Sequence, residues 1–390
     1  MSVAVSRTAG ARGAKRILLV AGEASGDLHA AGLIAALGRR DPSLVVWGIG
    51  GRESRASGMT TVVDIADIAA LGLVEVAEKV RAIIRTYRML RREIYERPPD
   101  LVVLIDFPEF NLALAAVAKR RGVPVFYYVS PQVWAWRRGR VRKILRRIDR
   151  LAALFPFEPA VYGNDPRVVF VGHPLLDRVR ATSTREETLL RHGLDPAKRL
   201  VALLPGSRRH EIESLLPEMA AAVERLVRRH PIQGAVSLAP TLSRGLAEPL
   251  VSRRGAPLPL IEGDTYNLVS ASDLVFVASG TATLEVALLE RPMIIMYRSS
   301  PLTFFIGKKL VDVPWIGMPN LIAGREIVPE LLQKDANAAR IEAEADAILS
   351  NSDRARTIEA DLAAVHASLG ERGAAERAAD LALGLLDTRS

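Results

Sequence analysis

Short apolar runs alternate with longer segments of helical spacing along most of the chain. Four runs in the first half have the continuous hydrophobicity and the length of strands that are buried on both faces of a parallel sheet. They are residues 16–21, 44–47, 100–105 and 125–129. Helical spacing follows the first run as far as Leu37, and it returns at 78–97 and at 112–121. This order of strand, turn and helix predicts βαβ units.

The same order of elements returns in the second half, although the two halves are not a sequence repeat. Strands are expected at 199–204, 273–278 and 293–297, with helices at 211–229 and from the turn after 278 to Leu289. The pattern predicts an α/β fold of two Rossmann-like domains whose parallel sheets face each other across a cleft. That arrangement is the GT-B architecture.

Composition suggests where these parts begin and end. Residues 1–15 are small, polar and basic, and we expect a disordered lead-in there. The Rossmann-like domains are expected at 16–180 and 181–335, with the polar stretch 180–198 as the linker. The tail, 336–390, is rich in Ala, Glu and Arg at helical spacing, which predicts a group of C-terminal helices.

Length and charge agree with this plan and narrow the function. A chain of 390 residues is long for one hydrophobic core, so two domains are the expectation. Its 53 basic and 44 acidic residues give a net charge of +9, which favours nucleotide phosphates, nucleic acid or an anionic membrane face as partners. A GC-rich genome that prefers Arg would produce the same excess.

Other totals exclude whole classes of protein. The absence of Cys excludes disulfides and thiolate metal sites. The 6 His residues form no H-x-x-x-H pair, and carboxylates are not clustered at metal-ligand spacing, so neither a metal nor a cofactor is expected. No apolar run reaches the roughly 18 residues of a membrane span, and the start lacks the apolar segment of a secretory signal.

A turn of Pro, Gly, Ser and Arg at 205–208 lies between an expected strand and an expected helix. Gly206 lets a ligand approach the backbone, and free amides at Ser207 and the helix start favour anions. Arg208 adds a forked cation that suits a diphosphate. We favour phosphate binding over an ordinary surface turn with a solvated Arg.

A second turn of this kind begins at Ser279 and continues through Gly280 and Thr281 into a helix. Its hydroxyls and amides suit phosphate, and Glu285 suits the hydroxyls of a ribose. The alternative is that Ser279 and Thr281 only cap the helix. Neither turn is a phosphate loop of NTP hydrolases, and no G-x-G-x-x-G follows the first strand, which argues against a dehydrogenase.

In the first half, Asp106 directly follows a buried strand and precedes a stiffening Pro. A carboxylate at that position is a candidate general base, and the alternative is a helix N-cap, a role that Asn111 could fill instead. Glu23, Ser25 and Asp27 follow the first strand, where they could bind sugar hydroxyls or cap the next helix. His173 lies near the junction of the halves, as a substrate contact or as a structural residue.

Residues 68–77 are apolar and lead into the helix expected at 78–97, which carries apolar residues on one side and arginines on another. Most such helices are ordinary surface helices. An apolar patch beside arginines also suits a peripheral enzyme on anionic lipid. The basic run 137–150, preceded by Trp134 and Trp136, permits RNA contact as well, but no RNA-binding motif accompanies it.

As an ordered set, six segments of the chain resemble the lipid-A-disaccharide synthases of Gram-negative bacteria. They are Gly22–Asp27, Asp106–Asn111, Tyr128–Trp136, Leu204–Arg208, Ala278–Glu285 and Met318–Arg325. The run Ser-Pro-Gln-Val-Trp-Ala-Trp at 130–136 is the most specific of them. One departure is Glu109, where the family more often has Asp.

The resemblance implies a cytoplasmic enzyme, peripheral on the inner membrane, that transfers 2,3-diacylglucosamine from UDP to 2,3-diacylglucosamine 1-phosphate. The product would be the β-1,6 disaccharide 1-phosphate of lipid A, and the configuration of the donor would be inverted. The first domain would then hold the acceptor, with Asp106 as base, and the second would bind UDP at Arg208 and Glu285. Asn320 falls in a motif expected to line the cleft, and Leu71, Leu73 and Val74 are expected to receive acyl chains.

Rival functions remain open at this stage. One is another UDP-sugar enzyme of the same architecture, such as an undecaprenyl-linked transferase or a UDP-N-acetylglucosamine 2-epimerase, which would need no lipid acceptor. Another is a nonenzymatic protein that binds RNA or membranes through its basic surface. The oligomeric state is not predicted.

Overall fold

The computed structural model describes residues 14–69, 75–131, 133–134, 138–252, 258–299 and 314–387. The chain divides into two compact units. Unit 1 comprises 1–174 together with 370–390, and unit 2 comprises 175–369. Each unit contains one wholly parallel sheet, so the α/β fold of two Rossmann-like domains is confirmed.

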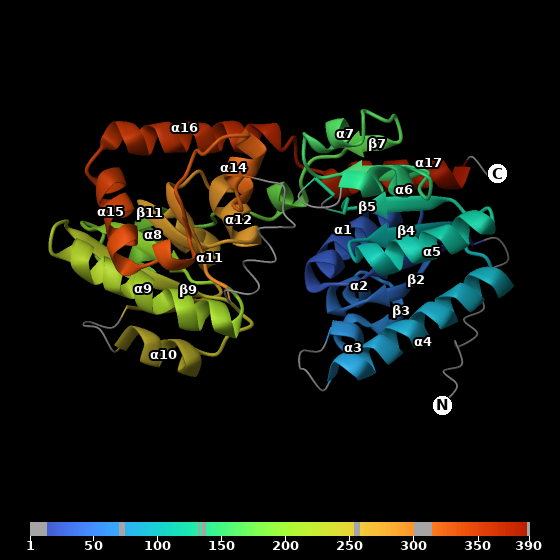
Figure 1. The fold of residues 1–390 in the computed structure, drawn as a ribbon, viewed down its shortest axis with the longest axis horizontal. Helices are drawn as coiled ribbons and strands as arrows, with labels where there is room; N and C mark the ends of the chain where they lie inside the picture. Colours follow the sequence, from blue (N-terminus) through green and yellow to red (C-terminus); the bar gives the residue numbers. More distant parts are fainter. Residues whose placement is uncertain are drawn as a thin grey trace. The chain divides into compact units, whose positions relative to one another are not determined.

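Unit 1 is built on a seven-stranded sheet in the order β3-β2-β1-β4-β5-β6-β7 (Figure 1). Its strands are β1 (Arg16–Ala21), β2 (Val45–Gly50), β3 (Thr60–Asp64), β4 (Leu101–Ile105), β5 (Val125–Tyr128), β6 (Arg150–Ala153) and β7 (Val168–Phe170). All five residues of β4 are buried, as its continuous hydrophobicity predicts.

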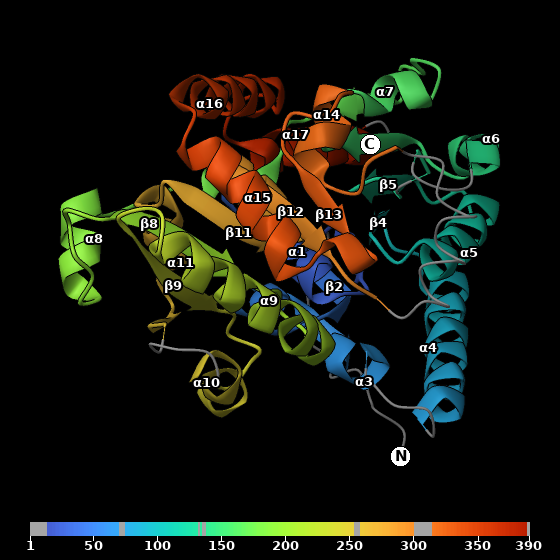
Figure 2. The ribbon, with the colours of Figure 1, turned by 60° about the vertical axis from the view of Figure 1, so that its left-hand side comes forward.

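Helices cover both faces of this sheet. They are α1 (Ala24–Arg40), α2 (Arg52–Ala56), α3 (Ile65–Ala69), α4 (Glu75–Glu96), α5 (Pro108–Arg120), α6 (Val141–Leu145), α7 (Glu158–Val161) and α17 (Ala374–Asp387), with a short 3-10 turn at Arg138–Arg140. A second 3-10 turn, Pro174–Asp177, begins at the last residue before unit 2 and continues into it. Leu18 and Val20 share one core with Leu90 of α4 and with α5. Helices α4 and α5 lie side by side on this face (Figure 2). Helices α1 and α17 pack against each other and cover strand residues that lie outside this core.

Unit 2 has a six-stranded sheet in the order β10-β9-β8-β11-β12-β13. Its strands are β8 (Arg199–Leu204), β9 (Ile232–Leu238), β10 (Leu260–Glu262), β11 (Leu274–Ala278), β12 (Met293–Tyr297) and β13 (Glu330–Leu332). Its helices are α8 (Arg185–Arg191), α9 (Arg209–Val227), α10 (Arg244–Ser252), α11 (Thr265–Ser270), α12 (Thr281–Leu288), α14 (Met318–Ala323), α15 (Ala338–Leu349) and α16 (Ser352–Ser368), with a 3-10 turn at Gln333–Asp335. Figure 2 shows α9 and α15 side by side over this sheet.

The C-terminal helices do not form one group. Helices α15 and α16 belong to unit 2, whereas α17 belongs to unit 1, where it contacts α1. Ion pairs from Arg39 and Arg40 to Glu376 fasten this contact, with a further pair from Arg40 to Asp380. Hence 336–390 is divided between the units, and the stretch expected as a linker, 180–198, contains α8 with a complete capping box at Thr184.

The order of strands decides where ligands can bind. In both sheets the direction of winding changes at the middle, between β1 and β4 in unit 1 and between β8 and β11 in unit 2. At such a switch point the connections leave in opposite directions, which opens a crevice at the carboxyl ends of the strands. The segments after these four strands begin at Gly22, Asp106, Pro205 and Ser279, which the sequence also singles out.

Candidate active site

Asp106 follows β4 at the switch point of unit 1. Asp106 and Phe107 have φ angles of 53° and 46°, so two consecutive residues other than glycine adopt the left-handed conformation. Such backbone is held only where its surroundings fix it, and it is found often at functional sites. Here Asn111 Nδ2 and Tyr127 Oη donate hydrogen bonds to the Asp106 carbonyl, at 2.6 Å and 2.7 Å. The turn therefore presents the carboxylate without using it as a helix cap.

The role expected for Asn111 was wrong, because it lies inside α5 and the N-cap of that helix is Phe107. Its amide instead bridges the carbonyls of Ile105 and Asp106. An N-cap side chain accepts from backbone amides, whereas this one donates to backbone carbonyls. Asn111 thus fixes the end of β4 and leaves the Asp106 carboxylate available.

The Asp106 carboxyl titrates at an unusually high pH for an aspartate. Burial raises its pKa to about 6, the negative charge of Glu23 adds to the increase, and a hydrogen bond with the Phe107 backbone opposes it. A carboxylate with this pKa is ionised at neutral pH and is a stronger base than an ordinary aspartate. Both properties suit a general base.

The residues after β1 separate into two kinds. Glu23 and Ser25 are exposed at the start of α1, where a ligand can reach them. Asp27 is only 3% exposed, and its carboxylate accepts hydrogen bonds from the Gly51, Glu53 and Ser54 amides. This corrects the prediction that Asp27 binds sugar, because its oxygens are already used to hold the start of α2.

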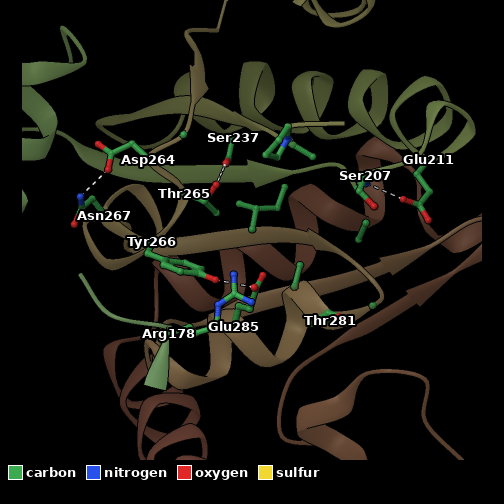
Figure 3. A pocket seen from close by; sticks show the side chains of 18 of the residues that line it. Arg178, Ser207, Glu211, Ser237, Asp264, Thr265, Tyr266, Asn267, Thr281 and Glu285 are labelled. Atoms are coloured by element: carbon green, nitrogen blue, oxygen red, sulfur yellow. Dashed lines mark hydrogen bonds between the residues drawn. The ribbon is translucent and has the colours of Figure 1, made fainter. Parts of the chain in front are cut away.

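A cavity of about 810 Å³ in unit 2 contains both predicted phosphate turns. Figure 3 shows it from close by, with the carboxyl ends of the strands supplying its walls. Every nucleotide-binding residue predicted from the sequence lines it: Gly206, Ser207, Arg208, Ser279, Gly280, Thr281 and Glu285. The fold thus brings together two turns that lie more than seventy residues apart in the chain.

The first turn differs from its prediction in one respect. The amides of Ser207 and Arg208, expected to bind phosphate, donate to Oε2 of Glu211 at 2.9 Å and 3.1 Å. The Arg208 guanidinium pairs with Oε1 of the same residue at 2.9 Å, although 72% of its side chain is exposed. The amides and the guanidinium of this turn therefore meet an anion, and that anion is the internal carboxylate of Glu211.

The second turn has no such occupant among the residues that the structure describes. Its N-cap is Gly280, which has no side chain, and Thr281 begins α12. The first amides of a helix have no acceptor within it, so this helix start is open to an anion. One turn further on, Glu285 Oε1 accepts a hydrogen bond from the Tyr266 hydroxyl at 2.8 Å (Figure 3).

Sequence reasoning missed several residues of this cavity. They are Arg178 and Arg180 from the segment after the 3-10 turn at 174–177, Ser237 at the end of β9, and Asp264, Thr265 and Tyr266 at the start of α11. Burial alone would raise the pKa of Asp264, but hydrogen bonds from His192, Asn267 and Arg191 lower it, so it stays ionised. Ser237 could have been found from its position at the end of β9, but that strand was not predicted.

Asn320 was expected to contact substrate, and the structure corrects this. It is fully buried, and Nδ2 donates to the Val328 carbonyl and to Glu330. Its Oδ1 accepts from the Ile327 and Val328 amides. Because both donors and the acceptor are used, Asn320 shapes the loop before β13 instead of binding a ligand.

The segment after β5 carries the most specific part of the sequence resemblance and rests on a buried acid. Glu158 is 2% exposed, and its Oε2 accepts from the Leu154 and Phe155 amides at 2.9 Å and 3.0 Å. Burial raises its pKa to about 7, while these hydrogen bonds and the side chains of Ser130 and Trp134 oppose the increase. The carboxyl thus holds the backbone that follows β6 and lies against Ser130 and Trp134 of this segment.

His173 is buried against the ring of Phe155, with 5.2 Å between the ring centroids. Burial, helped by the charge of His29, lowers its pKa to about 3, so it is neutral at physiological pH. Its position favours the structural alternative over substrate contact. The expected acyl-chain residues Leu71, Leu73 and Val74 lie outside the described residues.

In the described ranges, no helix combines the length and the hydrophobicity of a membrane span. Within the same ranges, His, Asp and Glu side chains form no group of three or more that could hold a metal ion.

Solved structures support the architecture. A calicheamicin glycosyltransferase, CalG4, superposes with a TM-score of 0.61 at 15% identity, over 96% of this chain and 98% of that one. A UDP-GlcNAc 2-epimerase from Neisseria meningitidis, bound to UDP-GlcNAc, reaches 0.60 at 13% identity, over 96% and 99%. At such low identity the likeness shows the GT-B fold and does not separate a transferase from an epimerase.

Sequence comparison distinguishes a transferase from an epimerase. A lipid-A-disaccharide synthase of Geobacter sulfurreducens is 47% identical over 373 residues, which are 95% of this chain and 97% of the relative. The model of the Lipid-A-disaccharide synthetase family matches residues 17–383. That match includes Asp106, both turns of the cavity and the segment against which Glu158 lies, and the chain belongs to the lipid-A-disaccharide synthetase family of glycosyltransferases.

Proposed function

We propose that this protein transfers 2,3-diacylglucosamine from its UDP derivative to the 6-hydroxyl of 2,3-diacylglucosamine 1-phosphate. The products are the β-1,6-linked disaccharide 1-phosphate and UDP. Membership of the family supports the reaction. The observation that carries the chemistry is the position of Asp106 at a switch point, with a buried carboxyl whose pKa is about 6.

Asp106 is the general base of this proposal. Its carboxylate takes the proton of the acceptor hydroxyl while that oxygen attacks the anomeric carbon from the face opposite UDP. One displacement inverts the anomeric configuration, which accounts for a β product from an α-linked donor. The hydrogen bonds from Asn111 and Tyr127 end on the carbonyl of Asp106, so its carboxylate oxygens remain for the proton.

The cavity of unit 2 is the UDP site. Arg208 and the amides at the start of α12 stabilise the charge that develops on the departing diphosphate. Glu285, oriented by Tyr266, accepts hydrogen bonds from the hydroxyls of the ribose. No metal takes part in this proposal, because the arginines and helix amides supply the positive potential.

The lipid substrates require access to a membrane surface, and α4 suits that contact. Leu90 and Ile94 face the core, but Val80 and Ile84 are 50% and 43% exposed. Arginines follow the same helix at Arg81, Arg85, Arg88 and Arg91. Exposed apolar side chains beside cations bind anionic bilayers through burial of apolar surface and through electrostatic attraction to the lipid headgroups. We therefore place α4 against the inner membrane, and we propose that Leu71, Leu73 and Val74, which precede this helix in the sequence, receive the acyl chains.

The reaction is tested by UDP release in detergent micelles that contain EDTA. UDP-2,3-diacylglucosamine is supplied with and without 2,3-diacylglucosamine 1-phosphate, and wild type is compared with Asp106→Ala. Release should require the acceptor, survive EDTA, and fall by about 10²- to 10⁴-fold in the variant, the range of general-base contributions.

The other outcomes separate the rivals. Activity that persists in Asp106→Ala would keep the reaction and move the base elsewhere. Loss of activity in EDTA, restored by a divalent cation, would contradict the metal-free mechanism. Conversion of UDP-N-acetylglucosamine without any lipid would indicate an epimerase instead.

The membrane contact has its own test. Wild type and Ile84→Glu are sedimented with vesicles that contain anionic phospholipid, and the bound fractions are compared. The variant places a negative charge on an exposed position, so binding should weaken while the unfolding temperature stays unchanged. Equal binding of both proteins would move the membrane surface away from α4.

A further inference from the structure

We propose that Glu211 is an internal competitor for the diphosphate: its carboxylate occupies the turn at 206–208 in the free protein and leaves when UDP binds. The inference rests on the proposed UDP site and adds a conformational step to it. It assigns to one residue a control over how tightly UDP, the product, is held.

The geometry of the turn shows that the carboxylate is built into it. Oε2 of Glu211 accepts from two successive amides, those of Ser207 and Arg208. Figure 3 shows the bond from Ser207. Glu211 is the third residue of α9, and a capping box accounts for one of these bonds, the one from the N-cap residue Arg208. The bond from Ser207 goes beyond helix capping. Two adjacent amides on one oxygen are what a phosphate oxygen would receive at a helix start.

Gly206 is shaped for this carboxylate. Its φ is 109°, and a Cβ atom there would lie 2.4 Å from Oε2 and 2.7 Å from Cβ of Glu211. On the other side of the turn, the Thr241 hydroxyl donates to the Ser207 carbonyl at 2.7 Å. The amides therefore point to Glu211 and the carbonyl to Thr241, so the turn is fixed in an anion-binding form before any ligand arrives.

The charges of the cavity explain why the carboxylate must move. Its lining has three arginines, Arg178, Arg180 and Arg208, and three carboxylates, Glu211, Asp264 and Glu285. Asp264 is held by His192 and Asn267, and Glu285 by Tyr266. Those two acids are fixed away from the turn. Glu211 is the acid that sits on the turn itself.

A diphosphate at this turn would lie within a few ångströms of the Glu211 carboxylate. Like charges at that distance repel strongly in a partly desolvated site, and both anions need the same two amides. Rotation of the Glu211 side chain removes the conflict and frees the guanidinium of Arg208 for the diphosphate. After transfer, return of the carboxylate would favour release of UDP.

The test is calorimetric titration of the full-length protein with UDP and, separately, with uridine. Glu211→Gln keeps the length of the side chain and an oxygen that can accept from both amides, so the helix start is preserved. It removes the charge that competes with phosphate. UDP should bind about tenfold more tightly to the variant, which corresponds to about 1.4 kcal/mol. Uridine, which has no phosphate, should bind equally to both proteins.

Glu213→Gln is the matched control, because it makes the same change two residues later. Glu213 lies on the same helix but pairs with Arg209 and does not line the cavity. Its UDP affinity should equal that of wild type. The gain in Glu211→Gln should also persist at high ionic strength, where long-range effects of charge are screened.

The outcomes distinguish this inference from the function on which it rests. If wild type binds no UDP, the nucleotide site is wrong and the inference falls with it. If wild type binds UDP and Glu211→Gln binds it equally or more weakly, the site stands and Glu211 is a positioning residue for Arg208. A gain for uridine as large as that for UDP would also overturn the competition with phosphate.

Discussion

A Cβ atom at Gly22 would lie 2.4 Å from both Cβ and Cγ of Phe107, so the first turn after β1 leaves space only for glycine. Phe107 stacks on Phe110 at 5.0 Å and follows Asp106 in left-handed backbone. Because Cβ of Phe107 moves only with its backbone, a side chain at position 22 would displace the turn that carries the Asp106 carboxylate.

We expect Gly22→Ala to reduce stability by about 1–3 kcal/mol, the usual cost of overpacking, and to lower kcat further than this loss explains. Gly38→Ala is the control, because it makes the same substitution in α1 where nothing lies within 4 Å of the added atom. It should preserve activity and gain up to about 1 kcal/mol from helix propensity. Urea unfolding and UDP release measure the two effects. A Gly22→Ala protein with wild-type kcat would refute the link from Phe107 to Asp106.

The activity should depend on pH through Asp106. A general base must be ionised, so kcat/KM should decline as the pH falls through about 6, where this carboxyl becomes protonated. Glu23 contributes to that value, because its negative charge disfavours a second negative charge nearby. Glu23→Gln should therefore lower the pKa of Asp106 and move the decline to lower pH.

The position of the decline is the measured quantity, because Glu23 is also a candidate substrate contact and its loss can change KM. Asp41→Asn removes a carboxylate from the other end of α1 and should leave the profile where it is. If Glu23→Gln moves the decline to higher pH or not at all, another group is the base.

The buried acid Glu158 makes a separate prediction about stability. Its carboxyl has an ordinary pKa of 4.5 when unfolded and about 7 when folded, so the unfolded state loses the proton first as the pH rises. The contribution of this group to the free energy of unfolding is complete below pH 4.5 and decreases between pH 4.5 and 7. The decrease is about 3 kcal/mol, because each unit of pKa difference corresponds to about 1.36 kcal/mol. Glu158→Gln cannot ionise and should lack this loss.

Urea unfolding at pH 5 and at pH 8 isolates the contribution, because Asp106 and His173 titrate equally in both proteins. The difference in unfolding free energy between variant and wild type should move in favour of the variant at the higher pH. A difference that is the same at both pH values would mean that Glu158 has an ordinary pKa in the folded protein.

Much of the fold was predictable because a continuous run of apolar residues marks a buried parallel strand in the sequence. The bounds of β1, β8 and β12 equal those expected, and β4 and β11 begin one residue later than expected. Six strands were missed: β3, β6, β7, β9, β10 and β13. Three of them, β7, β10 and β13, have only three residues each. Such strands are stabilised by pairing with a neighbour more than by their own pattern.

The site was predictable in kind and less so in detail. The sequence indicates that Asp27 and Asn320 are polar residues near strand ends, but it does not show which backbone amides they meet. Asp27 holds the start of α2, and Asn320 holds the loop before β13. Arg178 and Tyr266 were not predicted, because only the folded chain brings them to the cavity. Glu211 was within reach, since it stands three residues after Arg208 at a helix start.

Asn320 is predicted to affect stability and not affinity. Asn320→Ala leaves the buried amides of Ile327 and Val328 without an acceptor, which should cost about 2–4 kcal/mol in urea unfolding. The affinity for UDP should stay within about twofold of wild type, since the residue makes no ligand contact. Asn337→Ala, which removes the half-buried N-cap side chain of α15, should cost only about 1 kcal/mol. Unchanged stability with a weakened affinity would return Asn320 to the substrate site.

Tyr266 is predicted to act on the nucleotide through Glu285. Its hydroxyl donates to Glu285 Oε1 at 2.8 Å, which fixes the carboxylate and leaves Oε2 for the ribose. Tyr266→Phe keeps the ring and removes this one bond, whose typical worth of about 1 kcal/mol corresponds to about fivefold weaker binding. The loss should be the same for UDP and for uridine, because the ribose is common to both, whereas the effect of Glu211 requires the phosphates. Tyr95→Phe, on exposed α4, should change neither affinity. If Tyr266→Phe weakens UDP and leaves uridine unchanged, Glu285 meets the diphosphate end of the ligand, and the orientation of the nucleotide in the cavity must be reversed.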